Sequence, residues 1–341
     1  MAGYDAPTGD TTASESRRVT LRDIAEAVGV SISTASRAIN GAPGISGDVR
    51  SRIQAAAERL NYAGARAGNA IVISDVELAD NSAGEFMLAV QRGMERRARE
   101  LGLTLSVMLA GPSSVAWSDD ATSGYLLLSM QREDIVQHLW ERDIPAVIVN
   151  GREPLMRLDA VAPANRTGGY LGAHHLIQLG HRRILRLVHS PRPTICDRMA
   201  GWSLAMQEAG LETRDNLAIE MDAMRTDLAY RAVKERLAAN DGPDFTAILC
   251  CNDSCAFGAI AALTEAGVSV PSEVSIVGFD DIPTAALNSV PLTTIRVEAE
   301  DIGSRSISRL VERIRSQDNL ATYTETAVNL VIRDSAGPAR K

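Results

Sequence analysis

Hydrophobic residues recur at helical spacing in the stretch DIAEAVGVSISTASRAIN, residues 23–40, and on either side of it. The first stripe, at positions i, i+3, i+4 and i+7, consists of Leu21, Ile24, Ala25 and Val28. We expect a helix from Leu21 to Val28, capped by Thr20 and ended by Gly29, because glycine readily adopts the conformation that ends helices. Two more helices are expected, from Ser31 or Ser33 and from Ser46, with inward positions Ala35, Ala38 and Ile39, then Val49, Ile53, Ala56, Ala57 and Leu60.

Three short helices that share one core, with a tight turn at Gly29, are typical of a helix-turn-helix. The second helix then presents a polar face. Such a helix fits the major groove of DNA, where Arg37 can pair bidentately with guanine and serine, threonine or asparagine side chains can contact phosphates. A three-helix bundle that merely packs is the alternative.

Beyond residue 70, short apolar runs alternate with amphipathic helical stretches. The expected strands are 70–74, 103–109, 124–129, 145–150, 183–188, 217–221, 246–251 and 274–279, and the expected helices are 86–101, 133–142, 168–180, 198–210, 227–240 and 256–267. Strand-helix alternation predicts parallel sheets covered on both faces, and two sets of strands predict two lobes. Ligands bind such folds in a crevice at the carboxyl ends of the strands, here between the lobes.

Composition places the chain among ordinary globular proteins. Its 341 residues suffice for several folding units, and 45% are hydrophobic against 23% charged. No run approaches the ~20 apolar residues that span a bilayer, and the first residues lack the apolar core of a signal peptide. We therefore expect a cytoplasmic protein without a membrane partner, in which residues 1–16, rich in Thr, Ser, Gly and Asp, form a disordered tail.

Charge is distributed unevenly along the chain. The formal net charge is −8, yet residues 17–66 carry eight arginines against four acidic residues, and the excess of acidic residues lies mainly beyond them. A basic head suits attraction to nucleic-acid phosphates, while an acidic body limits indiscriminate binding to polyanions. A solvated charged face has the same signature.

Signatures of metal binding and catalysis are weak. The four cysteines, Cys196, Cys250, Cys251 and Cys255, lack a paired C-x-x-C and a nearby histidine, which favours buried thiols over a metal site. The chain has no G-x-G-x-x-G after a strand and no G-x-x-x-x-G-K-[ST] loop. We expect no cofactor, no metal and no catalytic residues, and a protein that is not an enzyme.

The stretch TLRDIAEAVGVSISTASRAINGAPGISGDVRSRIQAAAERLNY, residues 20–62, resembles the DNA-binding head of LacI/GalR-family transcriptional regulators. The resemblance implies that DNA bases are contacted by Ile32, Ser33 and Arg37. It implies that the DNA backbone is contacted by Thr20, Ser31, Thr34, Asn40 and Ser46.

The segments NRTGGYLGAHHLIQLGHRRI, DRMAGWSLAMQEAGL, ILCCNDSCAFGAIAALTEAGVSVPSEVSIVGFDDIPTAALNSVPLTTIRV and VNLVIRDS resemble the effector-binding core of the same family. The implied fold is a small all-α helix-turn-helix head plus an α/β two-lobed core, similar to periplasmic binding proteins, with doubly wound parallel sheets. The implied effector contacts are Arg198, Asp280, Asn252 and Thr194, and Asn150, after the strand 145–150, is a further candidate. Arginine and aspartate in one cleft can hold hydroxyls or a carboxylate through charge-assisted hydrogen bonds. An interlobe salt bridge or a strand-end cap is the alternative for each.

The chain departs from the family pattern in its linker, first lobe and tail. AGARAGNAIVIS replaces the usual hinge helix, whose leucine wedges into the minor groove, and this predicts a short flexible linker over 62–70. GPSSVAWSDDATS stands where a helix is usual, and the tail lacks a leucine heptad that would support a tetramer. The expected domains are the tail 1–16, the head 17–61, the linker 62–70 and a core 71–341, with lobes at about 71–160 with 298–318, and 161–290 with 320–335.

These observations predict a sequence-specific DNA-binding regulator, a repressor controlled by a small-molecule effector such as a sugar or related metabolite. As a homodimer it would place two heads on adjacent half-sites of double-stranded operator DNA. The alternative is a small-molecule sensor or solute-binding module with a degenerate head that no longer binds DNA. A doubly wound metabolic enzyme is a third possibility.

Overall fold

The computed structural model describes residues 19–39, 44–60, 69–75, 84–110, 115, 117, 123–129, 132–211, 217–315 and 320–340. The chain divides into two units, at 1–67 and 68–341. The expected tail 1–16 and nearly all of the expected linker 62–70 lie outside the described residues. Within the described part, no helix is long and apolar enough to cross a membrane.

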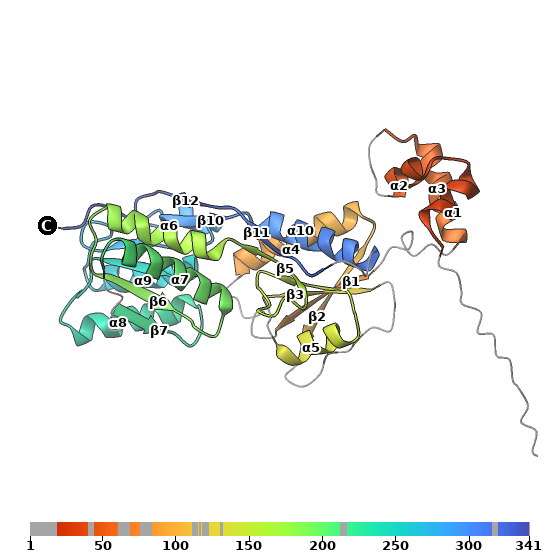
Figure 1. Cartoon of the computed structure of the whole chain (residues 1–341). Coiled ribbons are helices and arrows are strands. Elements are labelled where there is room, and N and C mark those ends of the chain that lie inside the picture. Colours follow the sequence, from red (N-terminus) through yellow and green to blue (C-terminus); the bar gives the residue numbers. More distant parts are fainter. Residues whose placement is uncertain are drawn as a thin grey trace, which may run out of the picture. The chain divides into compact units, whose positions relative to one another are not determined.

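The first unit contains helices α1 (Leu21–Val28), α2 (Ile32–Ile39) and α3 (Gly47–Arg59), as expected (Figure 1). Thr20 and Asp23 form a capping box, with the Thr20 amide donating to Asp23 Oδ2 at 2.7 Å. Gly29 ends α1 with φ 75°. The hydrophobic core of this first unit confirms the apolar stripes that predicted the helices, and it contains Ile24, Ala25, Ala35, Ala38, Ile53, Ala56 and Ala57.

Arginines of α3 stabilise the ends of the other two helices. Arg50 Nη1 donates to the carbonyl of Ala38 at 2.9 Å, and Arg52 Nη2 donates to that of Val28 at 3.2 Å. The last carbonyls of a helix have no partner within the helix, and cations are favourable there. Some of the positive charge of this unit is therefore used to join its helices.

The first lobe of the second unit is built on a six-stranded parallel sheet in the order β11-β5-β4-β3-β1-β2. Its strands are β1 (Asn69–Asp75), β2 (Thr104–Ala110), β3 (Gly124–Leu128), β4 (Ala146–Val149), β5 (Asp159–Pro163) and β11 (Tyr323–Thr326). One face packs on α4 (Gly84–Glu100) and α10 (Ala299–Arg315), and the other on α5 (Glu133–Glu141). Burial on both faces explains why the inner strands β3, β4 and β5 are nearly continuous apolar runs, whereas the edge strands β2 and β11 are partly exposed.

The second lobe is built on a four-stranded parallel sheet in the order β7-β6-β8-β9. Its strands are β6 (Ile184–Val188), β7 (Ala218–Glu220), β8 (Ala247–Cys250) and β9 (Ser275–Val277), and its helices are α6 (Asn165–Gln178), α7 (Pro193–Glu208), α8 (Thr226–Ala239) and α9 (Asp253–Glu265). Helix α6 packs against α7, and α8 against α9. A short helix, η3 (Pro283–Ala286), precedes the antiparallel pair β10 (Thr294–Val297) and β12 (Val328–Val331).

The described lobe boundaries differ from those expected. Strand β1 begins at Asn69, inside the expected linker, and β5 extends to Pro163, beyond the expected end of the first lobe. The expected assignment of 320–335 to the second lobe is wrong for β11, which pairs with β5. Buried Asp159 explains this placement, because its carboxylate accepts hydrogen bonds from the Thr322 amide and hydroxyl, just before β11.

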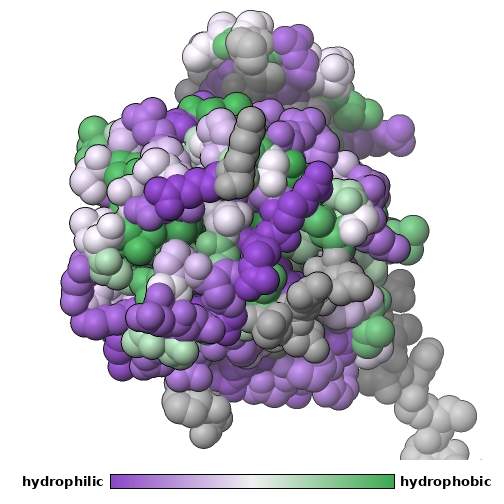
Figure 2. All heavy atoms as spheres, turned by 90° about the vertical axis from the view of Figure 1, so that its left-hand side faces the viewer, coloured by the Kyte–Doolittle hydropathy of each residue, from purple (hydrophilic) through white to green (hydrophobic). Residues whose placement is uncertain are grey.

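The end of the core formed by the second lobe is mainly hydrophilic, with hydrophobic residues scattered among polar ones (Figure 2). Scattered apolar residues are normal on a solvent-facing surface and need no special explanation. The candidate sites described below are a cavity in the core and the polar face of α2.

Candidate functional site

Helix α2 presents the residues expected to contact DNA bases. Ala35 and Ala38 are buried in the head, whereas Ser33 and Arg37 are exposed and Ile32 is 45% exposed. The helix therefore carries an arginine, a hydroxyl and an aliphatic side chain on a solvent-facing surface, the combination with which side chains read base edges in the major groove.

Three expected backbone contacts lie at helix starts. Ser31 Oγ accepts from the Thr34 amide at 3.0 Å, and the Ser31 and Thr34 hydroxyls are 2.8 Å apart. Ser46 Oγ accepts from the Val49 amide at 3.4 Å, and Thr20 caps α1. Amino ends of helices favour phosphate, so these positions suit a DNA backbone. Asn40 lies outside the described residues.

The core contains a cavity of about 500 Å³, solvent at its mouth included. Both lobes contribute to its wall, which consists of Glu85, Phe86, Met87, Asn150, Arg192, Thr194, Ile195, Arg198, Met224, Asn252, Ser254, Asp280 and Ile282. All five expected effector contacts are therefore brought together. Asn150 and Asn252 follow the carboxyl ends of β4 and β8, the edge at which doubly wound folds bind ligands.

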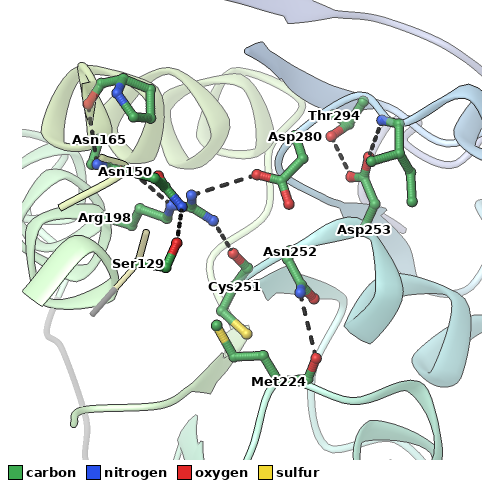
Figure 3. A network of polar contacts seen from close by, with 12 residues as sticks. Ser129, Asn150, Asn165, Arg198, Met224, Cys251, Asn252, Asp253, Asp280 and Thr294 are labelled. Carbon is green, nitrogen blue, oxygen red and sulfur yellow. Dashed lines mark hydrogen bonds and ion pairs between the residues drawn. The ribbon is translucent and has the colours of Figure 1, made fainter. Parts of the chain in front are cut away.

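Arg198 is the buried centre of a polar network in this wall (Figure 3). Its Nε donates to Asn165 Oδ1 at 2.9 Å, its Nη1 donates to the Cys251 carbonyl, and its Nη2 lies 3.5 Å from Asp280 Oδ1. The guanidinium also stacks 3.5 Å from the centroid of the Phe279 ring. Arg198 and Asp280 form the ion pair that the expected alternative named, although both lie in the second lobe, so this salt bridge does not join the two lobes.

Asp280 is held in an uncommon backbone conformation, with φ 117°. Its amide donates to the Ile295 carbonyl at 2.8 Å, and nearby Asp253 accepts from the Ile282 amide at 3.0 Å, which fixes the loop on both sides. Burial raises the pKa of Asp280 to about 6, although Arg198 opposes the shift. Burial also raises the pKa of Asp253 well above its ordinary value.

Asn252 and Thr194 have structural roles as well as positions on the wall. Asn252 is the N-cap of helix α9, its Oδ1 accepting from the Cys255 amide at 2.9 Å, which is a structural role different from the expected alternative of a strand-end cap. Thr194 is buried in the first turn of α7. That helix begins at Pro193, five residues before its expected start, which puts Thr194 and Arg198 one turn apart on the same face.

Asn150 belongs to the first lobe and has φ 54°. Its Nδ2 donates to Ser129 Oγ at 3.0 Å, while its buried Oδ1 has no hydrogen-bond partner among the described residues. A buried acceptor without a partner is costly, so this oxygen is a candidate ligand contact.

The sequence did not point to several wall residues. Glu85, Phe86 and Met87 come from the first turn of α4, and Glu85 accepts from the Thr284 amide of the other lobe at 3.3 Å. The signal in the sequence was their position after the first strand, where the loops of a parallel sheet meet the ligand. The remaining wall residues that were not predicted are Arg192, Ile195, Met224, Ser254 and Ile282.

Family models match both the head and the core of the chain. Residues 20–64 match the family described as bacterial regulatory proteins, lacI family. Residues 173–336 match the periplasmic binding protein-like domain.

Individual relatives match over nearly the whole chain. The protein named HTH-type transcriptional repressor PurR of Photobacterium profundum is 30% identical over 330 residues, covering 93% of this chain and 98% of that protein. A protein of the same name from Klebsiella pneumoniae is 28% identical over 338 residues, covering 93% of this chain and 96% of that protein.

Solved structures show the same fold. The complex of the transcriptional regulator CelR with cellobiose has a TM-score of 0.69 at 27% identity, covering 93% of this chain and all of that chain. The lac repressor dimer bound to operator and the anti-inducer ONPF has a TM-score of 0.68 at 25% identity, covering 94% of this chain and all of that chain. The chain therefore belongs to the LacI family and is a DNA-binding transcriptional regulator, with a helix-turn-helix head and an effector-binding core.

Proposed function

We propose that this regulator is a repressor that binds double-stranded operator DNA as a homodimer, and that a small molecule in the cavity of the core controls this binding. The relatives named as repressors, and the lac repressor solved as a dimer on its operator, support this proposal. A sugar or related metabolite is the proposed effector, in keeping with the cellobiose bound by CelR. The protein then acts by binding rather than by catalysis, in the cytoplasm, where operator DNA is found.

The observation that carries the proposal is a cavity wall shared by two lobes. Glu85 and Asn150 come from the first lobe, whereas Arg198 and Asp280 come from the second. A ligand that contacts both sets binds one arrangement of the lobes better than others and so shifts their equilibrium. In a dimer this changes the spacing of the heads, and a coupling of about 1–3 kcal/mol changes operator affinity about 5–150-fold.

On the operator, Ile32, Ser33 and Arg37 are proposed to contact bases. Arg37 supplies most of the discrimination, because a bidentate pair with guanine distinguishes one base pair by about 1–3 kcal/mol. The proposed backbone contacts, Thr20, Ser31, Thr34, Asn40 and Ser46, orient the head without reading sequence.

Fluorescence anisotropy with DNA fragments from upstream of the chain's own gene tests DNA binding. Arg37→Ala should reduce discrimination between the bound site and single-base-pair variants at one position. Arg59→Ala removes the same charge from an exposed position at the end of α3 and should weaken binding equally at all sites. If intact protein binds none of the promoters offered, or Arg37→Ala keeps full discrimination, the proposal fails and the sensor with a degenerate head is preferred.

The test of the effector response uses the same DNA fragments. Asp280→Ala should leave operator binding in place and abolish its response to the effector, because the carboxylate lies on the cavity wall. Full-strength effector binding by this variant in calorimetry would show that the site is misplaced. Chemical turnover of the effector during the assay would favour the alternative of a metabolic enzyme.

A further inference from the structure

Two thiols lie in contact behind the cavity wall. Cys251 Sγ and Cys255 Sγ are 3.5 Å apart, and both side chains are fully buried. Cys251 directly follows β8 and Cys255 belongs to the first turn of α9, so the pair spans the junction between these two elements. A disulfide needs sulfurs about 2.0 Å apart, so each sulfur has to move by roughly 0.7 Å. This shift is small beside the change between two staggered rotamers.

The surroundings of the two sulfurs differ. Arg198 Nη1 donates to the Cys251 carbonyl, and the guanidinium charge interacts favourably with negative charge on Cys251 (Figure 3). Cys251 also lies at the amino end of α9, where the helix dipole favours an anion. Burial raises the pKa of the Cys255 thiol well above its ordinary value. Cys251 is therefore the sulfur suited to attack an electrophile, while Cys255 stays protonated.

The cavity comes within one residue of each thiol. Asn252 and Ser254, which lie between the two cysteines in the sequence, are both on the cavity wall. A small uncharged oxidant that enters the cavity therefore has a single layer of residues between it and the sulfurs. Persistent disulfides are rare in the cytoplasm, and those that form there are usually transient and respond to oxidants.

We propose that Cys251 and Cys255 are a modification site, which hydrogen peroxide converts into an intramolecular disulfide. The Cys251 sulfur attacks one peroxide oxygen, the O–O bond breaks, and the departing hydroxide takes the Cys251 proton, which leaves a sulfenic acid and one water. Cys255 then attacks this sulfur, the S–O bond breaks, and the hydroxide leaves with the Cys255 proton as a second water. Both sulfurs are oxidised and the peroxide is reduced. The site depends only on the two thiols, so it stands apart from the proposed function.

The disulfide closes a ring that contains two residues of the cavity wall, Asn252 and Ser254. Asn252 Oδ1 already accepts from the Cys255 amide at 2.9 Å, and a covalent bond across the same turn restricts its opening further. Oxidation should therefore slow amide exchange in the first turn of α9, and reduction with dithiothreitol should restore it. The redox state of the pair then sets how rigid this part of the wall is.

The first test follows the reaction by mass spectrometry in full-length Cys196→Ser protein, which lacks the exposed thiol. Hydrogen peroxide should lower the mass by about 2 Da, the mass of two hydrogens, and dithiothreitol should reverse the change. Free thiols are then alkylated, the disulfide is reduced, and the released thiols receive a second label, which fragmentation should locate at Cys251 and Cys255. An unchanged mass in folded protein, when urea-unfolded protein is oxidised under the same conditions, would overturn the proposal. So would a disulfide that includes Cys250.

The second test compares two variants in the same background. Cys255→Ala should abolish the mass decrease, whereas Cys250→Ala should keep it, because each variant removes one buried thiol but only the first removes the partner of Cys251. Circular dichroism shows that both variants are folded, and the label positions in the parent protein decide the question if one is not. A mass decrease that persists in Cys255→Ala would refute the pairing. Amide exchange in α9 that is unchanged or faster after oxidation would refute the effect on the wall.

Discussion

Helices α6 and α7 cross at Gly169, directly against the backbone of Arg198. A Cβ on Gly169 would lie 2.9 Å from Arg198 Cα and closer still to the Arg198 carbonyl oxygen. A Cβ in ordinary van der Waals contact lies 3.4 Å or more from its neighbours, and the Arg198 carbonyl oxygen is the nearest of them, so Gly169→Ala must separate the two helices by roughly 1 Å or more at this crossing. The backbone that has to move carries the guanidinium of the cavity wall.

The expected cost has two opposing parts. Overpacking a close-packed interior costs about 1–3 kcal/mol, while alanine in place of glycine within a helix returns about 0.5–1 kcal/mol. The net loss of unfolding free energy should be about 0.5–2 kcal/mol. Effector affinity should fall further, because a retreat of this size stretches the 2.9 Å bond between Arg198 and Asn165, and a hydrogen bond to a charged group contributes about 1.5–3 kcal/mol.

Two glycine variants separate these effects. Gly258→Ala places a Cβ 2.8 Å from the Tyr230 amide nitrogen at the α8–α9 crossing, so it should lose similar stability without moving Arg198. Gly84→Ala, at the start of α4, meets nothing within 4 Å and should be neutral or stabilising. Urea unfolding and calorimetry of effector binding measure both quantities. A Gly169→Ala protein as stable as the parent, or one that loses no more affinity than Gly258→Ala, would refute this prediction.

Two further predictions concern the carboxylate of the wall and the cap of α1. The pKa of Asp280 is raised to about 6, and a ligand that donates a hydrogen bond to the ionised carboxylate lowers this pKa. The affinity for the effector should therefore rise with pH up to about 6 and level off above it. Asp280→Asn should flatten this pH profile. The charged and titratable groups around Asp280 are Arg198, Asp253, Asp281, Cys255 and, on the cavity wall, Glu85 and Arg192. Thr20→Ala should cost the head about 0.5–2 kcal/mol, seen as faster amide exchange in α1, and unchanged exchange would contradict the capping box.

Local patterns predicted the elements well. The helices of the head could be predicted from apolar positions one turn apart and from capping residues close to each helix start. Both signals depend only on residues that are neighbours in the sequence. The start of α7 was missed, although Ile195 in its first turn continues the apolar stripe of Met199 and Trp202 and proline at a first helical position is itself a start signal.

Long-range pairing was not predictable in the same way. Asp159 accepts hydrogen bonds from Arg309 at 2.9 Å and from Arg313 at 2.8 Å, and it also holds the residue before β11. These partners lie about 150 or more residues away in the sequence, and no local pattern connects them. A buried carboxylate with several donors therefore helps to decide that β11 joins the sheet of the first lobe.

Arg198 illustrates how the site differs from its expected chemistry. Its partners lie within the second lobe, whereas the next-door Asp197 forms an ion pair with Arg152 of the first lobe at 3.1 Å. Successive residues of α7 therefore contact the cavity network and the opposite lobe. Because a helix moves as a rigid unit, any shift of α7 on effector binding also changes the Arg152–Asp197 contact. Arg198 of the cavity wall and the interlobe ion pair of Asp197 with Arg152 are thus connected through a single peptide bond.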